Sequence, residues 1–358
     1  MARYRTVIRF LLSVGILFQG CDSDVKCRDD NGNEVGWYIL YKLPNVNGDG
    51  LLYLYMDEST NGWKLSREKI NSKSGTLANT LKPLLDFYDR KVESFGYMLF
   101  SDQPPDPYVA PPSFGHSKGV VMLDRKTGVW LSHSTPRFPT YRRRDFWPKS
   151  GNANAQTFMC VTYSYNDFKE IGLQLMYIHA YSYDYEIPGT FQNELRCVAQ
   201  RSCFPKEAPW FREKTLISTT GHYFHSYAKY KRFGDDLYSG LIAKTLKQDL
   251  YVKSWGKMCR PLPSNCSIPH RVYNVKEVTI LKGKPFNDTV DHAKWCVAPD
   301  GGWTCIADMN REVSQMGRGG GAICTNDGAV GKAFYTLITK HEPCKREHTH
   351  SNAQHREL

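Results

Sequence analysis

Residues 115–123 read Gly-His-Ser-Lys-Gly-Val-Val-Met-Leu, and residues 291–296 read Asp-His-Ala-Lys-Trp-Cys. Both stretches contain a His-x-Lys triplet, and the first leads directly into an apolar run that is typical of a buried strand. Side chains two residues apart on a strand point to the same face of a sheet. We therefore expect each triplet to present an imidazole and an ammonium together. The resulting pairs are the first dyad, His116 and Lys118, and the second dyad, His292 and Lys294.

Strand-like and helix-like segments alternate outward from the triplets. The segments expected in the first half are strands at 37–43, 51–56, 95–100, 120–123 and 129–131 and a helix at 76–87. Those expected in the second half are a strand near Leu216, a helix at 235–247 and strands near Val272 and Val278. The pattern predicts an α+β or α/β chain of two similar halves, 27–200 and 201–344, each with one triplet.

The composition is that of a folded, basic protein. Of the 358 residues 41% are hydrophobic, which excludes a disordered or collagen-like chain. The net charge of +11 favours a polyanionic partner or an anionic surface.

The segment 1–26 predicts a secretory signal peptide. Arginines precede an uncharged apolar run at 10–18, and small residues follow it, which places cleavage between residues 20 and 26. The alternative is an uncleaved anchor, but this run is far too short to span a bilayer, and we expect no stable membrane association. The polar tail 345–358 is expected to lie outside the fold.

The cysteines fit the same secretory route. Cleavage after Ser23 would remove one of the 11 cysteines, and the even number left predicts disulfides in an oxidising compartment. A zinc site is the competing interpretation, but the sequence has no Cys-x-x-Cys pair. Spacing leaves the pairing open, although Cys197 and Cys203 are close enough to close a small loop. Asn265 and Asn287 begin glycosylation sequons.

Two His-Lys dyads that face one another suit the hydrolysis of a phosphodiester. One histidine can attack phosphorus while the other protonates the leaving oxygen. The lysines can stabilise the negative charge that develops on the phosphoryl oxygens. We expect no metal and no cofactor, because lysines and a protonated histidine supply the positive charge. The alternative for each histidine is an ordinary structural or surface residue.

Further stretches along nearly the whole mature chain carry a family resemblance. They are, in the first half, Trp37–Pro44, Asp57–Ser59, Asn71–Ser72, Ser101–Pro105 and Gly115–Gly119. In the second half they are Ala228–Gly240, Leu262–Cys266, Asp291–Cys296, Asp308–Arg311 and Arg318–Gly321. In this order they resemble deoxyribonuclease II, the acid endonuclease with a phospholipase D-type fold. Within that family the chain most resembles a starfish venom member.

The resemblance implies a phospholipase D-like pseudo-dimer, two sheet-and-helix halves with the active site between them. It implies hydrolysis of DNA without metal to 3′-phosphate ends. It carries over both dyads as the catalytic core and His133 as a further catalytic histidine, for which a purely supporting role stays open. Asn310 and Ser134 match positions where the wider superfamily places a phosphate-contacting asparagine.

One departure concerns the carboxylate that the wider superfamily places seven residues after the motif histidine. Those positions hold Leu123 and Pro299, and Asp124 and Asp300 follow one residue later. The sequence therefore leaves open what orients the two histidines and which of them attacks.

The family pattern also implies three disulfides and leaves four cysteines, of which we expect Cys197 to pair with Cys203 and leave Cys259 and Cys296 open. Residues 142–144 are all arginine, either in a solvated loop or at a processing site. Cleavage after Arg144 would leave two chains joined by one of the implied bridges. The implied pairs are Cys27 with Cys160, Cys266 with Cys344, and Cys305 with Cys324.

Basic and aromatic residues alternate at 227–233. Lys229, Lys231 and Arg232 are candidates for DNA backbone contacts, with a solvated basic face as the alternative. Such contacts read no bases, so we expect cleavage that is nearly independent of sequence. Because a histidine beside a lysine is harder to protonate, we also expect an acid optimum.

The leading interpretation is an acid endodeoxyribonuclease that is secreted as a venom component or delivered to the lysosome. Two other functions stay open, a DNA- or cell-binding toxin without turnover and a phosphodiesterase that acts on phospholipid. The sequence does not predict the oligomeric state.

Overall fold

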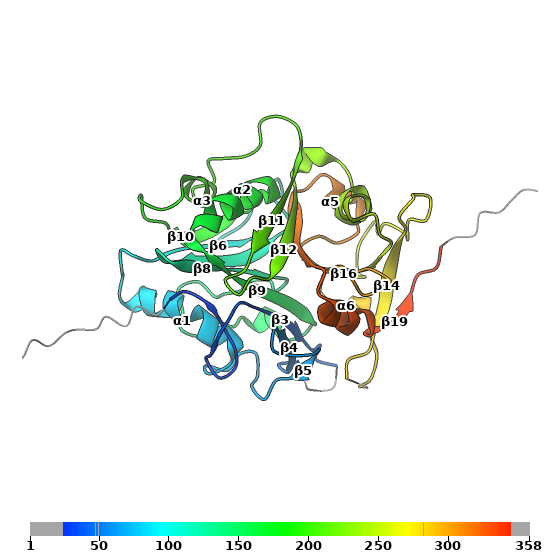
Figure 1. Cartoon of the computed structure of the whole chain (residues 1–358), viewed down its shortest axis with the longest axis horizontal. Helices are drawn as coiled ribbons and strands as arrows, with labels where there is room; N and C mark the ends of the chain where they lie inside the picture. The colour runs from blue at the N-terminus through cyan, green and yellow to red at the C-terminus, as the bar shows by residue number, and fades with distance from the viewer. Residues whose placement is uncertain (1–23, 47, 49, 282, 345–358) are drawn as a thin grey trace, which may run out of the picture.

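Two large β-sheets, one from each half of the sequence, form the frame of the molecule (Figure 1). The computed structural model describes residues 24–46, 48, 50–281 and 283–344. The expected signal peptide and polar tail lie outside the described residues. The chain leaves the first sheet after Glu186 and enters the second at Phe211, so the junction expected near residue 200 stays a prediction that falls in this connection.

The first sheet has the strand order β10-β6-β7-β8-β9-β3-β4-β5, and every neighbouring pair is antiparallel. Its central strands are continuous apolar runs that are buried on both faces. Helix α1 (Thr76–Asp89) covers one face with Leu77, Leu81 and Leu84. The strands are β3 (Trp37–Lys42), β4 (Tyr53–Asp57), β5 (Lys64–Leu65), β6 (Gly96–Ser101), β7 (Lys118–Leu123), β8 (Thr127–His133), β9 (Gln156–Ser164) and β10 (Ser182–Glu186).

The second sheet has the order β11-β12-β18-β17-β16-β13-β14-β15, and β19 also pairs with β14. Among its described pairs, β13–β14 is parallel and the others are antiparallel. This pairing makes the chain α+β and excludes the α/β alternative. The strands are β11 (Phe211–Ile217), β12 (Tyr223–Lys229), β13 (Leu250–Lys253), β14 (Val272–Val278), β15 (Phe286–Asn287), β16 (Trp295–Val297), β17 (Thr304–Ala307), β18 (Gly320–Thr325) and β19 (Ile338–His341).

One continuous hydrophobic core joins the two sheets. Helices α2 (Phe168–Ile178), α3 (Asn193–Ala199) and α6 (Gly328–Tyr335) contribute to it together with strands of both sheets. Figure 1 shows α2 and α3 on the side of the first sheet opposite to α1. Separating the halves would therefore expose apolar surface, which is unfavourable in water.

Most of the expected segments are present, with two corrections. The two strands expected near Val272 and Val278 are wrong as separate elements, because one strand, β14, spans both positions. The helix expected at 235–247 begins after the N-cap Asp236, whose carboxylate accepts from the Ser239 amide. It consists of the π-helix η4 (Leu237–Ile242) and α4 (Ala243–Leu246). The remaining elements are β1 (Cys27–Arg28), β2 (Glu34–Val35), η1 (Lys149–Gly151), η2 (Tyr165–Asp167), η3 (Lys231–Phe233), η5 (Asp288–Val290) and α5 (Val313–Met316).

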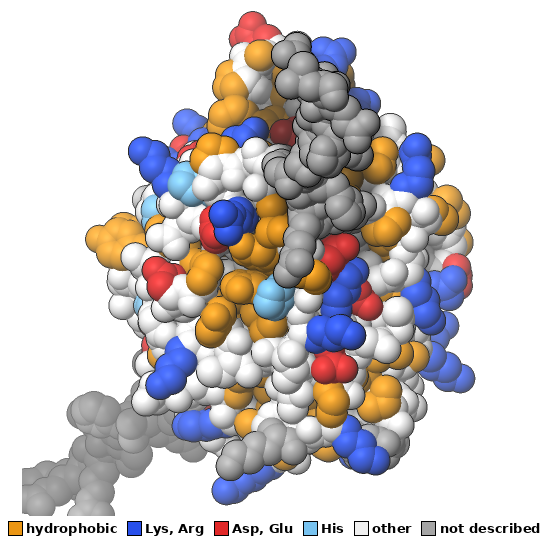
Figure 2. Space-filling view, turned by 90° about the vertical axis from the view of Figure 1, so that its right-hand side faces the viewer, with side chains coloured by type: hydrophobic (Ala, Val, Ile, Leu, Met, Phe, Trp, Pro, Cys, Tyr) orange, Lys and Arg blue, Asp and Glu red, His pale blue; other side chains and the backbone are white. Residues whose placement is uncertain are grey.

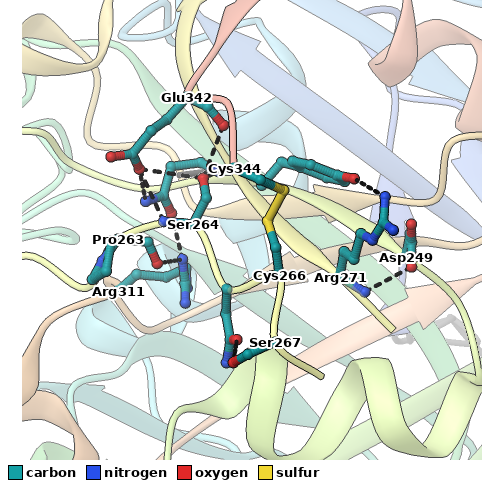
Figure 3. Close-up of a disulfide and its surroundings, with 12 residues drawn as sticks. Asp249, Pro263, Ser264, Cys266, Ser267, Arg271, Arg311, Glu342 and Cys344 are labelled. Carbon is teal, nitrogen blue, oxygen red and sulfur yellow. Dashed lines mark hydrogen bonds between the residues drawn. A yellow bond between two sulfur atoms is a disulfide. The ribbon is translucent and has the colours of Figure 1, made fainter. Parts of the chain in front are cut away.

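Four disulfides cross-link this frame, and the pairs implied by the family resemblance are among them. They are Cys27–Cys160, Cys197–Cys203, Cys266–Cys344 and Cys305–Cys324. Figure 3 shows the Cys266–Cys344 bridge beside hydrogen bonds from Ser264 to Glu342, which tie the loop ahead of β14 to the segment after β19. Cys259 is an exposed free thiol and Cys296 a buried one.

One face of the molecule carries its basic residues in dispersed positions. On the face in Figure 2, lysine and arginine side chains alternate with acidic and apolar ones and do not gather into one patch. The predicted glycosylation site Asn287 is exposed, and Asn265 is half-buried. Within the described part of the chain, no helix has the length and apolar character needed to cross a bilayer.

The arginine stretch 142–144 is held by ion pairs. Arg142 contacts the buried carboxylate of Asp184 at 2.9 Å, and Arg144 pairs with Asp89 on the last turn of α1. Two of its three arginines therefore bind the protein's own surface.

Candidate active site

Each dyad is anchored by a backbone hydrogen bond to the other half of the chain. His116, just before β7, donates its amide N–H to the carbonyl of Gly319 at 2.8 Å. His292, just before β16, donates its amide N–H to the carbonyl of Ala155 at 2.9 Å. These reciprocal contacts bring the two dyads to one junction between the halves.

Asp102, which directly follows β6, contacts both members of the first dyad. Lys118 Nζ lies 2.6 Å from Asp102 Oδ1, and His116 Nε2 lies 3.9 Å from Oδ2. Arg318, from the second half, approaches the same Oδ2 at 3.2 Å. Burial alone would raise the pKa of the Asp102 carboxyl, but Lys118, His116 and Arg318 outweigh it and hold that pKa well below its usual value. Asp102 therefore stays ionised.

A backbone carbonyl fixes the orientation of His116. Its Nδ1 lies 2.7 Å from the carbonyl oxygen of Asp308. Because a carbonyl only accepts, Nδ1 must donate, and the lone pair of the neutral ring is on Nε2. The Asp308 side chain accepts from the Gly321 amide at 3.1 Å, and burial raises its pKa to about 8.

The second dyad has aromatic and backbone neighbours instead of a shared carboxylate. Lys294 Nζ donates to the carbonyl of His292 at 2.7 Å. The His292 ring lies against the indole of Trp255, with ring centroids 4.0 Å apart. Within the described residues its Nε2 is buried and has no hydrogen-bond partner.

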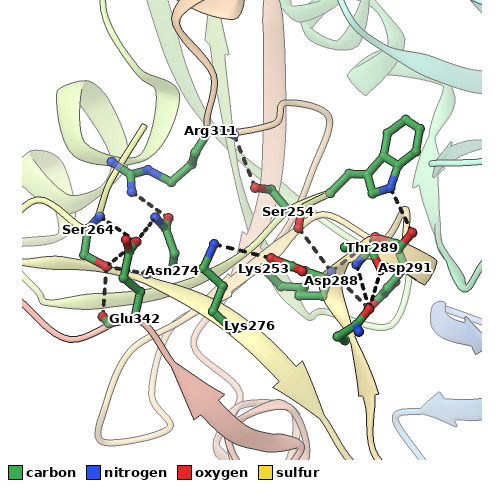
Figure 4. Close-up of polar contacts among 12 residues, drawn as sticks. Lys253, Ser254, Ser264, Asn274, Lys276, Asp288, Thr289, Asp291, Arg311 and Glu342 are labelled. Atoms are coloured by element: carbon green, nitrogen blue, oxygen red, sulfur yellow. Dashed lines mark hydrogen bonds and ion pairs between the residues drawn. The ribbon is translucent and has the colours of Figure 1, made fainter. Parts of the chain in front are cut away.

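Asp291 fixes the segment that leads into the second dyad. Its carboxylate is buried and contacts Lys253 Nζ at 3.1 Å (Figure 4), and it accepts from the Tyr41 hydroxyl at 2.6 Å. Tyr41 belongs to the first sheet and Lys253 to the second, so this carboxylate also connects the halves. The other carboxylate oxygen of Asp291 accepts from the Ala293 amide at 2.9 Å, which holds the backbone between Asp291 and Lys294.

The surroundings keep both histidines neutral. Burial is the main cause that lowers the pKa of His116 to about 3; Asp102 opposes it, and Lys118 and Lys294 add to it. Burial, followed by the charges of Lys294 and Lys118, lowers the pKa of His292 to about 3. Burial and the charge of Lys118 lower the pKa of Lys294 to about 7. Because Lys118 acts on both histidines, the dyads share one electrostatic environment.

His133 lies at the end of β8, and its ring is closed to solvent. Its Nδ1 accepts from the Thr135 amide at 3.2 Å, so the proton of the neutral ring is on Nε2. That Nε2 has no partner among the described residues. Burial, followed by the charge of Lys118, lowers the pKa of His133 well below its usual value. The structure therefore presents His133 as a neutral donor near the first dyad.

The two residues expected to contact phosphate differ in their bonding. Asn310 is buried, and its Oδ1 accepts from the Trp255 amide at 3.1 Å, beside the second dyad. Ser134 donates its hydroxyl to the Oε1 of Gln156 at 2.6 Å and accepts from the Thr157 amide at 3.0 Å. The Ser134 hydroxyl is thus committed to two protein partners.

The basic residues near 230 separate into two groups. Lys229 is fully buried, and its ammonium donates to the carbonyls of Gln315, Met316 and Arg318 at 3.2, 2.9 and 2.7 Å. Three acceptors use all three N–H groups, so Lys229 holds the α5 turn and has no donor left for a phosphate. Lys231 and Arg232 reach solvent over the rings of Tyr230 and Trp210, at 5.7 and 5.0 Å.

The carboxylates that follow the motif histidines bind backbone amides in turns and do not orient the histidines. Asp124 accepts from the amides of Lys126 and Thr127, and Asp300 accepts from the amide of Gly302. Orientation of His116 comes instead from Asp102 and the Asp308 backbone. In the described ranges, no group of three or more His, Cys, Asp or Glu side chains is arranged to hold a metal ion.

Comparison with known proteins gives the family. The Deoxyribonuclease II family model matches residues 26–344. The chain belongs to the deoxyribonuclease II family. It is 39% identical to deoxyribonuclease-2-alpha of Rattus norvegicus over 334 residues, which is 89% of this chain and 95% of the rat protein. It is 35% identical to deoxyribonuclease-2-beta of Homo sapiens over 356 residues, 96% of this chain and 99% of the human protein.

Membership confirms the family resemblance that the ordered sequence stretches carry, and the chain is therefore an enzyme of the deoxyribonuclease II family. Plancitoxin-1 of Acanthaster planci is also a relative, 34% identical over 338 residues, 91% of this chain and 94% of that protein. This identity does not exceed that with the mammalian enzymes, so overall similarity does not single out plancitoxin-1.

Proposed function

We propose that this deoxyribonuclease II family enzyme hydrolyses DNA by a metal-independent, histidine-based mechanism with an acid optimum, and that it leaves 3′-phosphate ends. The observation that carries the proposal is the convergence of the two dyads, each bonded through its histidine backbone to the opposite half. We further propose that the two sheets form a phospholipase D-like pseudo-dimer with the scissile phosphate between them.

The orientation of His116 favours it as the nucleophile. Its Nδ1–H is held by the Asp308 carbonyl, which leaves the Nε2 lone pair for attack on phosphorus. The P–O5′ bond then breaks, and His292 transfers its proton to the leaving O5′. Water next attacks the phosphohistidine and gives its proton to His292, which releases the 3′-phosphate and restores both rings.

Positive charge from both halves stabilises the phosphoryl oxygens in this mechanism. Lys118 and Lys294 act on both histidines electrostatically, and Arg318, which forms an ion pair with Asp102, adds a third positive charge. In a site with little water such fixed charges act strongly on a developing oxyanion.

The lowered pKa values supply the reason for an acid optimum. The general acid must carry a proton, and His292, with its pKa lowered to about 3, gains one only as the pH falls. A bound phosphodiester adds negative charge and raises that pKa, so the protonated fraction grows in the complex. Activity should therefore rise from neutral to acid pH, as suits a lysosome or an acidic secretion.

Nicking of supercoiled plasmid at pH 5 in EDTA tests the proposal. Wild type should convert the plasmid to open circles whose nicks carry 3′-phosphates, whereas His116→Ala and His292→Ala should not. Lys231→Ala and Arg232→Ala should weaken DNA binding without removing turnover. A wild-type enzyme that binds DNA without nicking it would refute the catalytic proposal, and a rate maximum above pH 7.5 would refute the acid optimum.

The two-chain form stays a prediction of its own. Cleavage after Arg144 would leave fragments joined by the Cys27–Cys160 bridge. Purified secreted protein should then run as one band without reductant and as two bands with it. A single band under reducing conditions would reject the processing.

A further inference from the structure

A buried glutamine in the first half directly follows Ala155, whose carbonyl accepts the backbone N–H of His292. Gln156, the first residue of β9, has no exposed surface. Its Oε1 accepts from the Ser134 hydroxyl at 2.6 Å, and the Ser134 oxygen is in turn held by the Thr157 amide at 3.0 Å. The carboxamide oxygen of Gln156 is therefore fixed, while its Nε2 is buried and has no partner among the described residues.

Asn310 shows the same bonding in the second half. Its carboxamide oxygen accepts from the Trp255 amide at 3.1 Å, and its own backbone amide donates to Gln315 at 2.7 Å. Each half of the site thus contains a buried carboxamide whose oxygen is held by the protein. In such an arrangement the NH₂ group is the part that can bind a ligand.

The position of Gln156 connects it to both dyads. The preceding residue, Ala155, accepts the backbone N–H of His292. In the register of β8 and β9, His133 is opposite Phe158, so Gln156, two residues before Phe158, points to the same face of the sheet as His133. The charge of Lys118 lowers the pKa of His133, which places that face within the field of the first dyad.

Three partnerless polar atoms belong to residues that the register and the bonds above connect to the dyads. They are Nε2 of His133, Nε2 of Gln156 and Nε2 of His292, among the twelve buried side-chain atoms without a hydrogen bond in the described chain. Native proteins rarely leave several such groups together, because each costs about 1–3 kcal/mol. Gln156 Nε2 and the Nε2–H group of the neutral His133 ring are donors. Donors beside lysine ammonium groups suit an anion.

We propose that Gln156 Nε2 donates a hydrogen bond to a non-bridging oxygen of the scissile phosphate, as the first-half counterpart of Asn310. Ser134 is then a positioning residue that fixes the Gln156 carboxamide and does not touch the phosphate. The inference rests on the proposed function, because it requires a phosphodiester between the dyads. It replaces the expectation that Ser134 itself is the phosphate contact.

Phosphorothioate substrates test the contact. An oligonucleotide with a single cleavable linkage is prepared with oxygen, Rp sulfur or Sp sulfur at the non-bridging position, and cleavage is measured at pH 5. Sulfur accepts hydrogen bonds poorly, so wild type should cleave one diastereomer more slowly than the oxygen substrate. Gln156→Leu should lower kcat on the oxygen substrate about 10–100-fold, the range expected for a hydrogen bond to a charged group. It should also abolish discrimination against that one diastereomer.

A structural role for Gln156 predicts a different result. Loss of packing would slow all three substrates equally and leave the sulfur discrimination unchanged, and this outcome would overturn the proposal. Gln156→Glu keeps the size and the bond to Ser134 but replaces the NH₂ with an oxygen, so it should lose at least as much activity as Gln156→Leu. It serves as the second variant if Gln156→Leu does not fold, as judged by thermal melting.

A double-mutant cycle tests the role of Ser134. Ser134→Ala should lower kcat less than Gln156→Leu and should cause no further loss in the Gln156→Leu background. An equal loss in both backgrounds would show that Ser134 contacts the phosphate itself and would overturn its positioning role. Thr304→Val is the matched control, because it removes a buried, partnerless hydroxyl at the far end of β17 and should leave the rate unchanged.

Failure of this inference is distinguishable from failure of the proposed function. If wild type does not cleave the oxygen substrate in EDTA, the proposed function fails. If wild type cleaves it and Gln156→Leu keeps the wild-type sulfur discrimination, only the role of Gln156 fails.

Discussion

The two dyads have the same pair of side chains in different surroundings. Around the first, Asp102 contacts Lys118 and His116, and a carbonyl holds His116 Nδ1. Around the second, Trp255 covers the His292 ring, and Lys294 turns to the backbone of its own dyad. Burial nevertheless lowers the pKa of both histidines to about 3.

This difference separates the roles that an identical motif leaves equivalent. A ring whose Nδ1 is hydrogen-bonded to a carbonyl has a defined lone pair, which a nucleophile requires. A ring held by an aromatic face keeps its tilt but has no fixed proton position, which suits a group that releases and accepts a proton in turn. The asymmetry lies in the neighbours of the dyads, and substitutions there can test it.

The largest effects are expected at the histidines, and the leaving group distinguishes them. His116→Ala and His292→Ala should each lower kcat on DNA by about 1,000-fold or more, because each removes a chemical step. Thymidine 3′-(p-nitrophenyl phosphate) has a leaving group that needs no proton. His292→Ala should recover the first step on this substrate, seen as a burst of p-nitrophenolate of about one equivalent per enzyme followed by slow turnover, and His116→Ala should show no burst. Recovery by His116→Ala alone would reverse the assignment.

Removal of the shared carboxylate should have the next largest effect. Asp102→Asn keeps the shape but loses the charge that holds Lys118 at 2.6 Å and Arg318 at 3.2 Å. We expect kcat on DNA to fall about 10–100-fold, in line with charged hydrogen bonds. Asp124→Asn is the control, since in the described structure that carboxylate accepts hydrogen bonds from the backbone amides of Val25, Lys126 and Thr127. Equal rates for Asp102→Asn and wild type would remove Asp102 from the site.

A smaller effect is expected at the aromatic neighbour of the second dyad. Contacts between rings contribute about 0.5–1.5 kcal/mol, which corresponds to a rate change of about 2–10-fold. Trp255→Phe should therefore keep most of the activity, and Trp255→Leu should lose several-fold. The loss should disappear from the burst phase on thymidine 3′-(p-nitrophenyl phosphate), because release of p-nitrophenolate does not need the proton of His292. A loss that persists there would place Trp255 in a role unrelated to the general acid.

The sequence predicted the dyads because both chemical groups belong to one short, strand-compatible motif. Asp102 was harder to recognise as a partner, because its contact with Lys118 depends on the register of β6 against β7, which pairs Ser101 with Lys118. The carbonyl of Asp308 has no side-chain signal at all, since every residue offers one. Such contacts come from tertiary structure and not from residue type.

Lys229 shows how a local pattern can mislead. Alternation of basic and aromatic residues at 227–233 resembles a solvent-exposed binding face, but Lys229 ends a buried strand and meets three carbonyls around α5. Gln156 is the opposite case, because nothing in the residues around it suggested a site. The two cases have one cause: burial of a polar residue is decided by the elements packed over it.

The smallest expected effect is on the pH dependence of the free energy of unfolding, to which the histidines of both dyads contribute. For a histidine with its pKa lowered to about 3, the unfolded chain binds the proton first, so the free energy of unfolding falls as the pH drops from about 6.5 toward 3. Between pH 7 and pH 5 one such histidine destabilises the fold by about 2 kcal/mol. Asp308, with a raised pKa, acts in the opposite direction over much of this range, so the informative quantity is the difference between variant and wild type.

Urea unfolding at pH 7 and pH 5 measures that difference. His116→Gln and His292→Gln should each lose less stability than wild type between the two pH values. Because the pKa of each histidine is lowered to about 3, the change should be of similar size in His116→Gln and His292→Gln. Variants that follow the wild-type pH dependence would show that neither ring is held neutral by burial. The shared low pKa on which the comparison of the dyads depends would then be lost.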